Sequence, residues 1–184
     1  LGAEKITPLM TRIMDATLVL HGEHTINAST FTAMVTSSTL ANASQVVASA
    51  IGSLSGPLHG GANEKVVSML SMIDSKEDIR PWLDDTLKAK NVVWGMGHRE
   101  YSVKDPRANI LTDMVQDLFN EREGGVTDIF EKAIELEKAC EEKLAHKGVY
   151  PNVDFYSGIL YKEMDIPTDI FTPIFAMSRV SGWL

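Results

Sequence analysis

His59 lies among glycines in the segment GPLHGGAN. Glycine lacks a Cβ atom, so the backbone here can approach a ligand closely. We expect His59 to lie at a helix N-terminus, where the helix dipole disfavours the imidazolium and keeps the ring neutral. A neutral histidine could donate a hydrogen bond to a carbonyl or enolate oxygen. A tight helix-helix turn with a structural histidine is the alternative.

A second histidine, His98, follows glycines in the segment WGMGHREY. Arg107 comes soon after it, at the predicted start of a helix. Its planar guanidinium could bind a carboxylate through two parallel hydrogen bonds. A salt bridge with Asp105 or Glu100 is the alternative for Arg107.

An aspartate, Asp154, lies between Val153 and Phe155 in the segment NVDFYSG. Apolar neighbours could raise the pKa of this carboxyl group toward that of a general base. The alternative is an N-terminal helix cap. Together with the histidines and arginines, Asp154 suits chemistry on an anionic carbonyl compound.

The segment HGEH places His21 and His24 three residues apart, which could put both rings on one helical face. Such a pair could ligate a metal, as in a metal-dependent hydrolase, but a site needs a third ligand and supporting hydrogen bonds. We therefore expect no metal site. His21 and His146 are expected to be structural or solvated.

The elements that must position these residues are helices, because apolar residues recur at helical spacing and few alternating stretches are long enough for strands. Thr7-Pro8 is a good cap and first-turn pair, and Asp105-Pro106 marks another start. The sequence therefore predicts an all-α fold. The expected helices span residues 8–20, 28–54 (one or two helices, interrupted near Asn42), 60–74, 79–90, 106–122, 128–146, 153–163 and 169–184.

Composition is that of an ordinary globular chain: 184 residues, 44% hydrophobic, with 25 acidic against 17 basic side chains and a net charge of −8. Nucleic acid is excluded as the main partner because no dense basic cluster is present. No membrane span is expected. The single cysteine, Cys140, fits a reducing compartment, and without a signal-peptide pattern we expect a cytoplasmic location.

Five segments, in this order and spacing, resemble the citrate synthase family: HGEHTINASTFTA, IGSLSGPLHGGANEKV, GMGHREYSVKDPRA, NVDFYSGILY and FTPIFAMSRVSGW. The resemblance covers nearly the whole chain, as the central and later part of a longer enzyme. It implies an all-helical, two-domain homodimer that condenses oxaloacetate with acetyl-CoA and hydrolyses the citryl thioester to citrate and CoA. No metal or other cofactor is implied.

The resemblance also implies a division into domains. Residues 1–61 and 165–184 would be parts of the large domain. Residues 62–164 would form the small domain, which closes when oxaloacetate binds and excludes water from the reaction.

The resemblance further assigns roles to individual residues. Asp154 would remove a proton from the acetyl methyl group, His59 would hydrogen-bond the thioester oxygen, and His98 would polarise the ketone of oxaloacetate. The oxaloacetate-binding positions match His24, Arg107 and Arg179. Candidates for the CoA phosphates are Arg99 and Lys104, although Glu100 and Ser102 depart from the basic pattern of many relatives.

The sequence leaves four questions open. A 2-methylcitrate synthase, which uses propionyl-CoA, shares the same catalytic residues. The other alternative is a non-catalytic helical fragment that pairs with itself. We expect the 184-residue chain by itself to be inactive, because much of the scaffold that supports the site would lie in the rest of the longer enzyme. Dimer or hexamer, and regulation by NADH, are also undecided.

Overall fold

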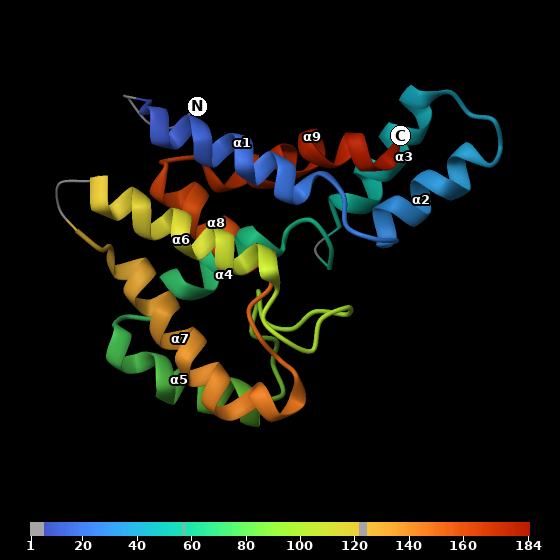
Figure 1. The fold of residues 1–184 in the computed structure, drawn as a ribbon. Coiled ribbons are helices and arrows are strands. Elements are labelled where there is room, and N and C mark those ends of the chain that lie inside the picture. The colour runs from blue at the N-terminus through green and yellow to red at the C-terminus, as the bar shows by residue number, and fades with distance from the viewer. Residues whose placement is uncertain (1–5, 57, 122–124) are drawn as a thin grey trace. The chain divides into compact units, whose positions relative to one another are not determined.

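The computed structural model describes residues 6–56, 58–121 and 125–184, which fold as helices joined by turns (Figure 1). Within these residues there is no strand, and a single antiparallel bridge joins Met96 and Pro151. The predicted all-α fold is confirmed. The α-helices are α1 (Pro8–Gly22), α2 (Ala28–Ser37), α3 (Ala43–Leu54), α4 (Ala62–Ser71), α5 (Ile79–Lys88), α6 (Pro106–Glu121), α7 (Asp128–Leu144), α8 (Val153–Glu163) and α9 (Phe171–Trp183).

Capping residues account for several helix starts. The Thr7 side chain accepts a hydrogen bond from the backbone of Met10, and Pro8 occupies the first turn of α1. The interruption expected near Asn42 is confirmed, because α2 ends at Ser37 and Asn42 opens α3 with Gln45 in a reciprocal capping box.

Some predicted helix ends are displaced by short 3₁₀ turns. Lys76–Asp78 precedes α5, Ala145–Lys147 follows α7, and Thr168–Ile170 precedes α9. After the second of these turns Gly148 adopts a left-handed conformation with φ of 69°, which ends the helical run as its glycine type predicts.

The chain divides into two compact units. Unit 1 consists of Leu1–Ala62 and Ile166–Leu184, and unit 2 consists of Asn63–Asp165.

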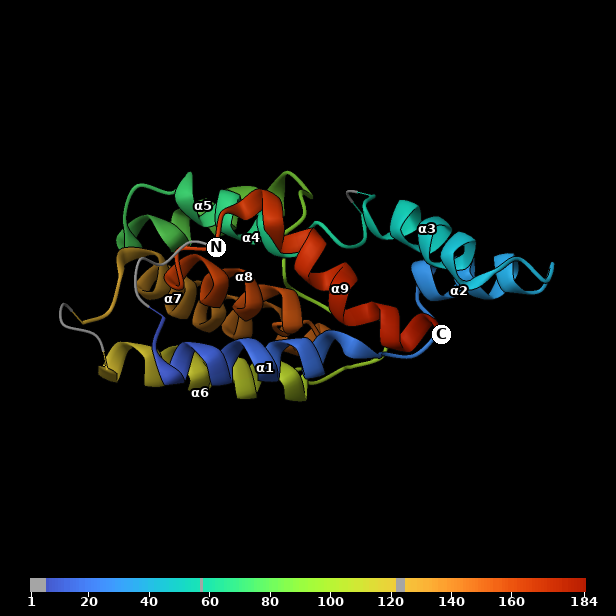
Figure 2. The same ribbon diagram turned by 90° about the horizontal axis from the view of Figure 1, so that it is seen from above.

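In unit 1, helices α2 and α3 run side by side, and α9 packs against α1, α2 and α3 (Figure 2). A Cβ atom on Gly182 of α9 would lie 2.4 Å from the carbonyl oxygen of Gly22, so the two backbones can approach only because residue 182 is glycine. The core of this unit is formed by Ala33, Val46, Ala50, Leu54, Phe175, Ala176 and Trp183.

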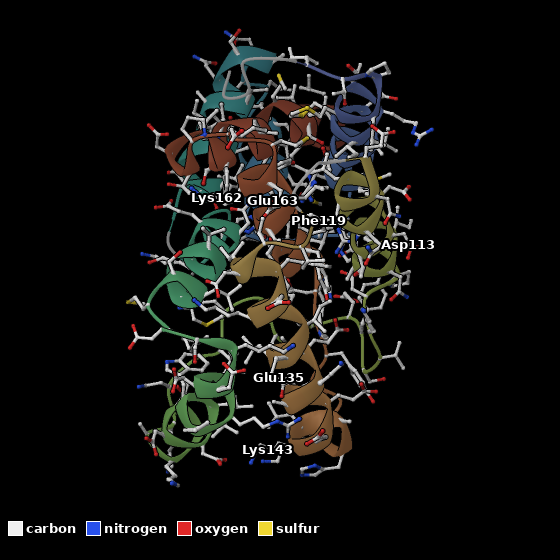
Figure 3. The ribbon with its side chains drawn as sticks, turned by 90° about the vertical axis from the view of Figure 1, so that its left-hand side faces the viewer. Asp113, Phe119, Glu135, Lys143, Lys162 and Glu163 are labelled. Carbon is white, nitrogen blue, oxygen red and sulfur yellow. The ribbon has the colours of Figure 1, made fainter. Side chains whose placement is uncertain are left out.

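In unit 2, helix α8 is the central element, since nearly all its residues are buried and it packs against α6. Helix α7 packs against α5, and its Phe130 meets Phe119 of α6 with ring centroids 4.9 Å apart. Ion pairs join α5 and α7 at the surface, where Glu135 and Lys143 of α7 lie beside α5 (Figure 3). Exposed pairs of this kind add little stability, so the apolar contacts hold the unit together.

Within the described ranges, every helix is too short or too polar to cross a lipid bilayer.

Candidate functional site

The predicted site residues fall into two groups, one in each unit. His24, His59 and Arg179 belong to unit 1. The second group, in unit 2, consists of His98, Arg99, Lys104, Arg107 and Asp154.

His59 lies in the turn before α4, and its ring contacts the first turn of α2. The backbone N–H of Ser29 donates to Nε2 of His59 at 3.2 Å, and the Ser29 hydroxyl lies 2.8 Å from the same nitrogen. Because a backbone N–H can only donate, Nε2 must be an acceptor. The proton of the neutral ring is therefore on Nδ1.

The charge state of His59 agrees with this geometry. Burial lowers the pKa of the imidazole below its usual value, and the positive charge of Arg179 lowers it further. The geometry and the direction of the pKa shift both favour the expected neutral ring. The helix N-terminus that contacts the ring is that of α2, however, and not that of the helix that follows His59 in sequence.

Arg179 is almost fully buried on α9, with 3% of its surface exposed. Its Nε donates to the carbonyl oxygen of His21 at 2.7 Å, and its guanidinium lies 4.8 Å from the Phe175 ring centre. A buried guanidinium held in this way is oriented before any anion arrives.

His21 is a structural histidine, as expected. It is buried, and its Nδ1 donates to the carbonyl oxygen of Thr17 at 2.7 Å. Helix α1 ends at Gly22, so His24 lies in the following loop and does not share a helical face with His21. In the described part of the chain no three histidine, cysteine or acidic residues gather as a metal site would require.

The loop that carries His24 is tied to α2 through Asn27. The amide nitrogen of Asn27 donates to the carbonyl oxygen of His24 at 3.3 Å. Its amide oxygen accepts from the backbone of Thr30 at 3.0 Å, which caps α2, and from the Ser29 hydroxyl at 2.8 Å. One side chain therefore connects the His24 loop to the helix start that contacts His59.

In unit 2, His98 is held by its own loop. The backbone N–H of Glu100 donates to Nδ1 of His98 at 3.0 Å, so the proton of the neutral ring is on Nε2. Burial lowers the pKa of His98. Among the nearby charges Asp105 and Glu100 raise it and Arg107 lowers it, and the net shift is downward.

The loop that carries His98 pairs with the segment just before α8. Gly97 donates its N–H to the Tyr150 carbonyl at 2.7 Å, and Asn152 donates its N–H to the Gly95 carbonyl at 2.9 Å. The Asn152 side chain also donates to the Gly97 carbonyl at 2.8 Å. His98 and the start of α8, where Asp154 lies, are thereby fixed to one another.

Glycine is needed at Gly95 for two reasons. Its φ is 79°, in the left-handed region, and a Cβ atom there would lie within 2.9 Å of Val66 and Phe155. This close approach lets the loop lie directly on the first turn of α8.

Asp154 lies in the first turn of α8, with one carboxylate oxygen buried. The helix cap is Asn152, whose side chain accepts from the backbone N–H of Asp154 at 2.9 Å. The alternative in which Asp154 caps the helix is therefore wrong, because its neighbour does so. The raised pKa expected for Asp154 stays a prediction.

Arg107 forms the salt bridge with Asp105 that the sequence offers as the alternative to carboxylate binding. Its Nε and Nη2 donate to the two carboxylate oxygens of Asp105 at 3.1 and 2.8 Å. Burial works to raise the pKa of Asp105, which is 1% exposed, but the hydrogen bonds and charge of Arg107 outweigh burial and lower it. The pair fixes the direction of the guanidinium.

The two candidates for a CoA contact differ in their surroundings. Lys104 pairs with Glu137 at 2.5 Å, and Glu137 also accepts the hydroxyl hydrogen of Tyr156. Burial, followed by the Glu137 charge, raises the pKa of Tyr156 above its usual value. Arg99 is exposed in the loop after His98. Both assignments to CoA stay predictions.

Sequence reasoning did not single out four residues that position the site: Asn27, Ser29, Asn152 and Trp183. Asn27 and Asn152 precede predicted helices, and asparagine is a preferred cap, so these two were detectable. Ser29 stands in a run rich in alanine, serine and threonine, and Trp183 in an apolar helix. Nothing in the local sequence distinguishes them.

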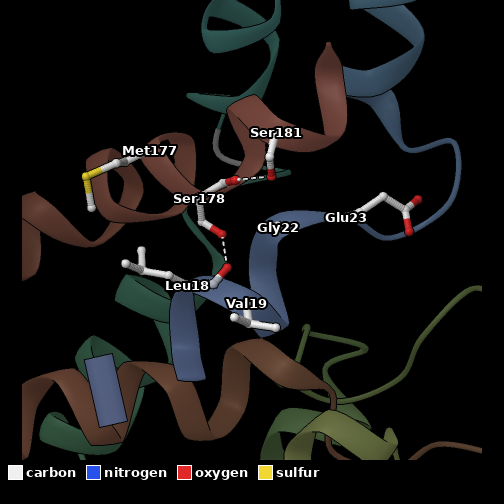
Figure 4. A pocket seen from close by; sticks show the side chains of 7 residues that line it. All are labelled: Leu18, Val19, Gly22, Glu23, Met177, Ser178 and Ser181. Carbon is white, nitrogen blue, oxygen red and sulfur yellow. Dashed lines mark hydrogen bonds between the residues drawn. The ribbon is translucent and has the colours of Figure 1, made fainter. Parts of the chain in front are cut away.

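A groove in unit 1 lies between α1 and α9 (Figure 4). The Ser178 hydroxyl donates across it to the carbonyl oxygen of Leu18. Its other lining residues are Val19, Gly22, Glu23, Met177 and Ser181. None of the predicted site residues lines it.

Comparison with known proteins gives concordant matches. The profile of the family described as "Citrate synthase, C-terminal domain" matches residues 1–184. The citrate synthase of Synechocystis sp. is 54% identical over 177 residues, which is 96% of this chain and 44% of that protein. The citrate synthase of Acidithiobacillus ferridurans is 50% identical over 184 residues, which is 100% of this chain and 48% of that protein.

Solved structures agree with the sequence matches. A crystal structure of citrate synthase from Thermotoga maritima matches 97% of this chain and 48% of its own, with a TM-score of 0.87 and 38% identity. A ternary complex of carboxymethyl coenzyme A and oxaloacetate with citrate synthase from Thermoplasma acidophilum also matches 97% and 48%, with a TM-score of 0.90 and 35% identity. The chain thus spans about half the length of these relatives.

Proposed function

This chain belongs to the citrate synthase family, and we propose that it supplies the residues with which such an enzyme condenses acetyl-CoA with oxaloacetate and hydrolyses citryl-CoA to citrate and CoA. One observation carries the proposal. His59 and His98 each accept a backbone N–H on one ring nitrogen, so each is a neutral donor at the other. Two such donors suit a reaction that polarises two carbonyl groups.

Asp154 acts first in this proposal, as the base that removes a proton from the acetyl methyl group. The resulting negative charge develops on the thioester oxygen, where the Nδ1–H of His59 stabilises it. The enol carbon then attacks the ketone of oxaloacetate. His98 donates from Nε2 to the ketone oxygen, which becomes the hydroxyl of the product, and water then cleaves the thioester.

Oxaloacetate carries two carboxylates, and we assign them to His24, Arg107 and Arg179. Asp105 holds Nε and Nη2 of Arg107, so Nη1 is the nitrogen that we assign to a substrate carboxylate. Arg179 is buried and already oriented by the His21 carbonyl. Preorganised cations of this kind bind a carboxylate with little loss of side-chain entropy.

CoA enters this reaction as a substrate, and the proposal includes no metal or resident cofactor. The solved relative from Thermoplasma acidophilum, with carboxymethyl coenzyme A and oxaloacetate, supports the pair of substrates. Arg99 is the better candidate for a CoA phosphate, because Lys104 is paired with Glu137.

The wider setting is also proposed. Residues 62–164 would act as the small domain, and the rest as part of the large domain. A homodimer is supported by the exposed apolar face of α2, which carries Phe31, Met34 and Val35 at helical spacing. We place the reaction at entry to the tricarboxylic acid cycle and in the cytoplasm, where the buried thiol of Cys140 would stay reduced.

The test is a thiol-release assay with oxaloacetate and acetyl-CoA on two proteins. One is the 184-residue chain, for which we expect no appreciable turnover. The other is a chimera that joins it to the N-terminal part of the Synechocystis relative, for which we expect turnover. A folded chimera without turnover contradicts the proposal, and faster turnover with propionyl-CoA would favour the 2-methylcitrate alternative.

A further inference from the structure

The Ser29 hydroxyl has three hydrogen-bond neighbours and no access to solvent, since Ser29 is 0% exposed. Asn27 Oδ1 lies 2.8 Å away, His59 Nε2 lies 2.8 Å away, and the indole nitrogen of Trp183 lies 3.2 Å away. The three neighbours come from separate parts of unit 1. A buried hydroxyl surrounded in this way has its hydrogen-bonding fixed by its neighbours.

The roles of two neighbours are unambiguous. An indole N–H can only donate, so Ser29 Oγ accepts the hydrogen of Trp183. Asn27 Oδ1 already accepts the backbone N–H of Thr30, which identifies it as the amide oxygen. The single hydroxyl proton of Ser29 therefore points to Asn27 Oδ1 or to His59 Nε2.

Hydrogen bonds in such a chain polarise one another. A hydroxyl that accepts a hydrogen bond becomes a stronger donor. The indole N–H of Trp183 therefore makes the Ser29 hydroxyl a stronger donor to either of its two acceptors, Asn27 Oδ1 and His59 Nε2. Because Nε2 already accepts the Ser29 backbone N–H, its 2.8 Å contact with Oγ is a hydrogen bond only when the hydroxyl donates to Nε2. In the arrangement in which the hydroxyl donates to Nε2, this contact and the Ser29 backbone N–H both favour the tautomer with its proton on Nδ1.

Helix α9 contributes twice to the surroundings of His59. Arg179 and Trp183 are four residues apart and so lie on one face of the helix. Arg179 is the charged group that acts on the His59 ring, and it disfavours the imidazolium. Trp183 is 7% exposed and packed in the core of unit 1, which fixes the position of its N–H.

We propose that Trp183 is a positioning residue for the condensation reaction: through Ser29 Oγ, its indole N–H holds His59 in the tautomer that carries its proton on Nδ1. This inference rests on the proposed function of His59 as the donor to the thioester oxygen. Trp183 does not touch substrate in this account. It acts only through Ser29 and His59.

The first test does not depend on activity. The 184-residue chain, labelled with ¹⁵N in its histidine rings, is compared by long-range ¹H–¹⁵N spectra at pH 7 with a Trp183→Phe variant, which keeps the aromatic bulk but lacks the N–H. His59→Gln identifies the His59 signals. We expect the Nε2 resonance of His59 to move toward the protonated position in Trp183→Phe.

A matched control is Trp82→Phe, which removes an indole N–H from α5 in unit 2 and should leave the His59 signals unchanged. If Trp183→Phe does not fold, Ser29→Ala serves instead, because it removes the hydroxyl and keeps the backbone N–H. An unchanged His59 tautomer in a folded Trp183→Phe or Ser29→Ala variant overturns the proposal. Loss of stability with the same tautomer would show that Trp183 only packs.

The second test uses the active chimera. Trp183→Phe should lower kcat by about threefold to tenfold, less than the 10²- to 10³-fold loss that follows removal of an oxyanion donor. The KM for oxaloacetate should change by less than about twofold, because the variant acts on the donor to the other substrate. A change confined to the KM for oxaloacetate overturns the proposal. An inactive chimera would count against the proposed function alone, since the spectra test Trp183 separately.

Discussion

The two units hold their histidines by different means. In unit 1, His59 is fixed by Ser29, 30 residues earlier in the chain, and Ser29 is in turn bound by Trp183, 154 residues later. In unit 2, His98 is fixed by the backbone of Glu100, only two residues away. The first histidine depends on tertiary packing and the second on the shape of one loop.

This difference also sets which ring nitrogen donates. His59 accepts on Nε2 and donates from Nδ1, whereas His98 accepts on Nδ1 and donates from Nε2. Burial lowers the pKa of both imidazoles, which favours the neutral ring. Two unrelated local structures thus produce the same chemical property, a neutral imidazole donor with a fixed direction.

The largest expected effect is the loss of condensation rate when Asp154, the proposed base, is replaced. Asp154→Ala in the chimera should lower the rate of condensation by about 10²- to 10⁴-fold, the usual contribution of a general base. Oxaloacetate affinity, measured by calorimetry, should change little because the base acts on the other substrate. Asp113→Ala, an exposed aspartate on α6, is the control and should keep full activity. Loss of oxaloacetate binding along with turnover would make Asp154 a structural residue.

The next effect concerns the buried cation of unit 1. Arg179→Leu should raise the oxaloacetate concentration needed for half-saturation, since loss of a buried charged partner costs about 2 to 5 kcal/mol. Saturation kinetics on the chimera measure this. Arg80→Leu removes an exposed arginine of α5 and should leave the curve unchanged. If the oxaloacetate saturation curve of Arg179→Leu matched that of the unsubstituted chimera, Arg179 would not bind oxaloacetate.

A smaller effect compares two helix caps. Asn152→Ala should destabilise unit 2 by about 0.5 to 2 kcal/mol, as loss of a cap does. It should also lower kcat, because the loop that carries His98 loses the hydrogen bond from the Asn152 side chain to the Gly97 carbonyl. Asn42→Ala removes the cap of α3 in unit 1, away from the predicted site residues. It should cost similar stability without lowering kcat. Urea unfolding measures the stability of the two variants and initial rates measure their kcat. Equal effects of the two substitutions on kcat would contradict the proposed role of Asn152 in holding the His98 loop.

The smallest expected effect is the dependence of stability on pH. The pKa values of His59 and His98 are lower in the folded chain than the usual 6.5, so the unfolded chain binds protons first as the pH falls. The part of the free energy of unfolding that depends on these two histidines should be complete above pH 6.5 and should decrease as the pH falls below 6.5. Urea titrations at several pH values should show a weaker decrease for His59→Gln and for His98→Gln. A decrease as steep as in the wild type would mean that other groups cause it.

The sequence predicts the helices well because periodicity and caps are local properties. Asn42, Pro8 and Pro106 mark real helix starts. The 3₁₀ turns beside α5, α7 and α9 were not predicted, because they depend on how the neighbouring helices pack. For the site, the reactive residues are recognisable from their motifs, and Asn152 stands where a helix cap is expected. The sequence offers both Asp105 and Glu100 as partners of Arg107, and the choice between them required coordinates.

What the sequence cannot show is the contact that gives each histidine its direction. The Ser29 contact to His59 joins α2 to the turn before α4, and the Trp183 contact joins α9 to α2. Such long-range pairs leave no local pattern. In unit 2 the GHRE segment did place His98 beside glycines, but the backbone donor at Glu100 depends on the conformation of the loop.

The most direct test of the central claim is the tautomer of both histidines in the same sample. Long-range ¹H–¹⁵N spectra of the 184-residue chain at pH 7 should show His59 protonated at Nδ1 and His98 protonated at Nε2, each ring neutral, with His59→Gln and His98→Gln used for assignment. The same tautomer for both rings, or an imidazolium at either position, would contradict the account.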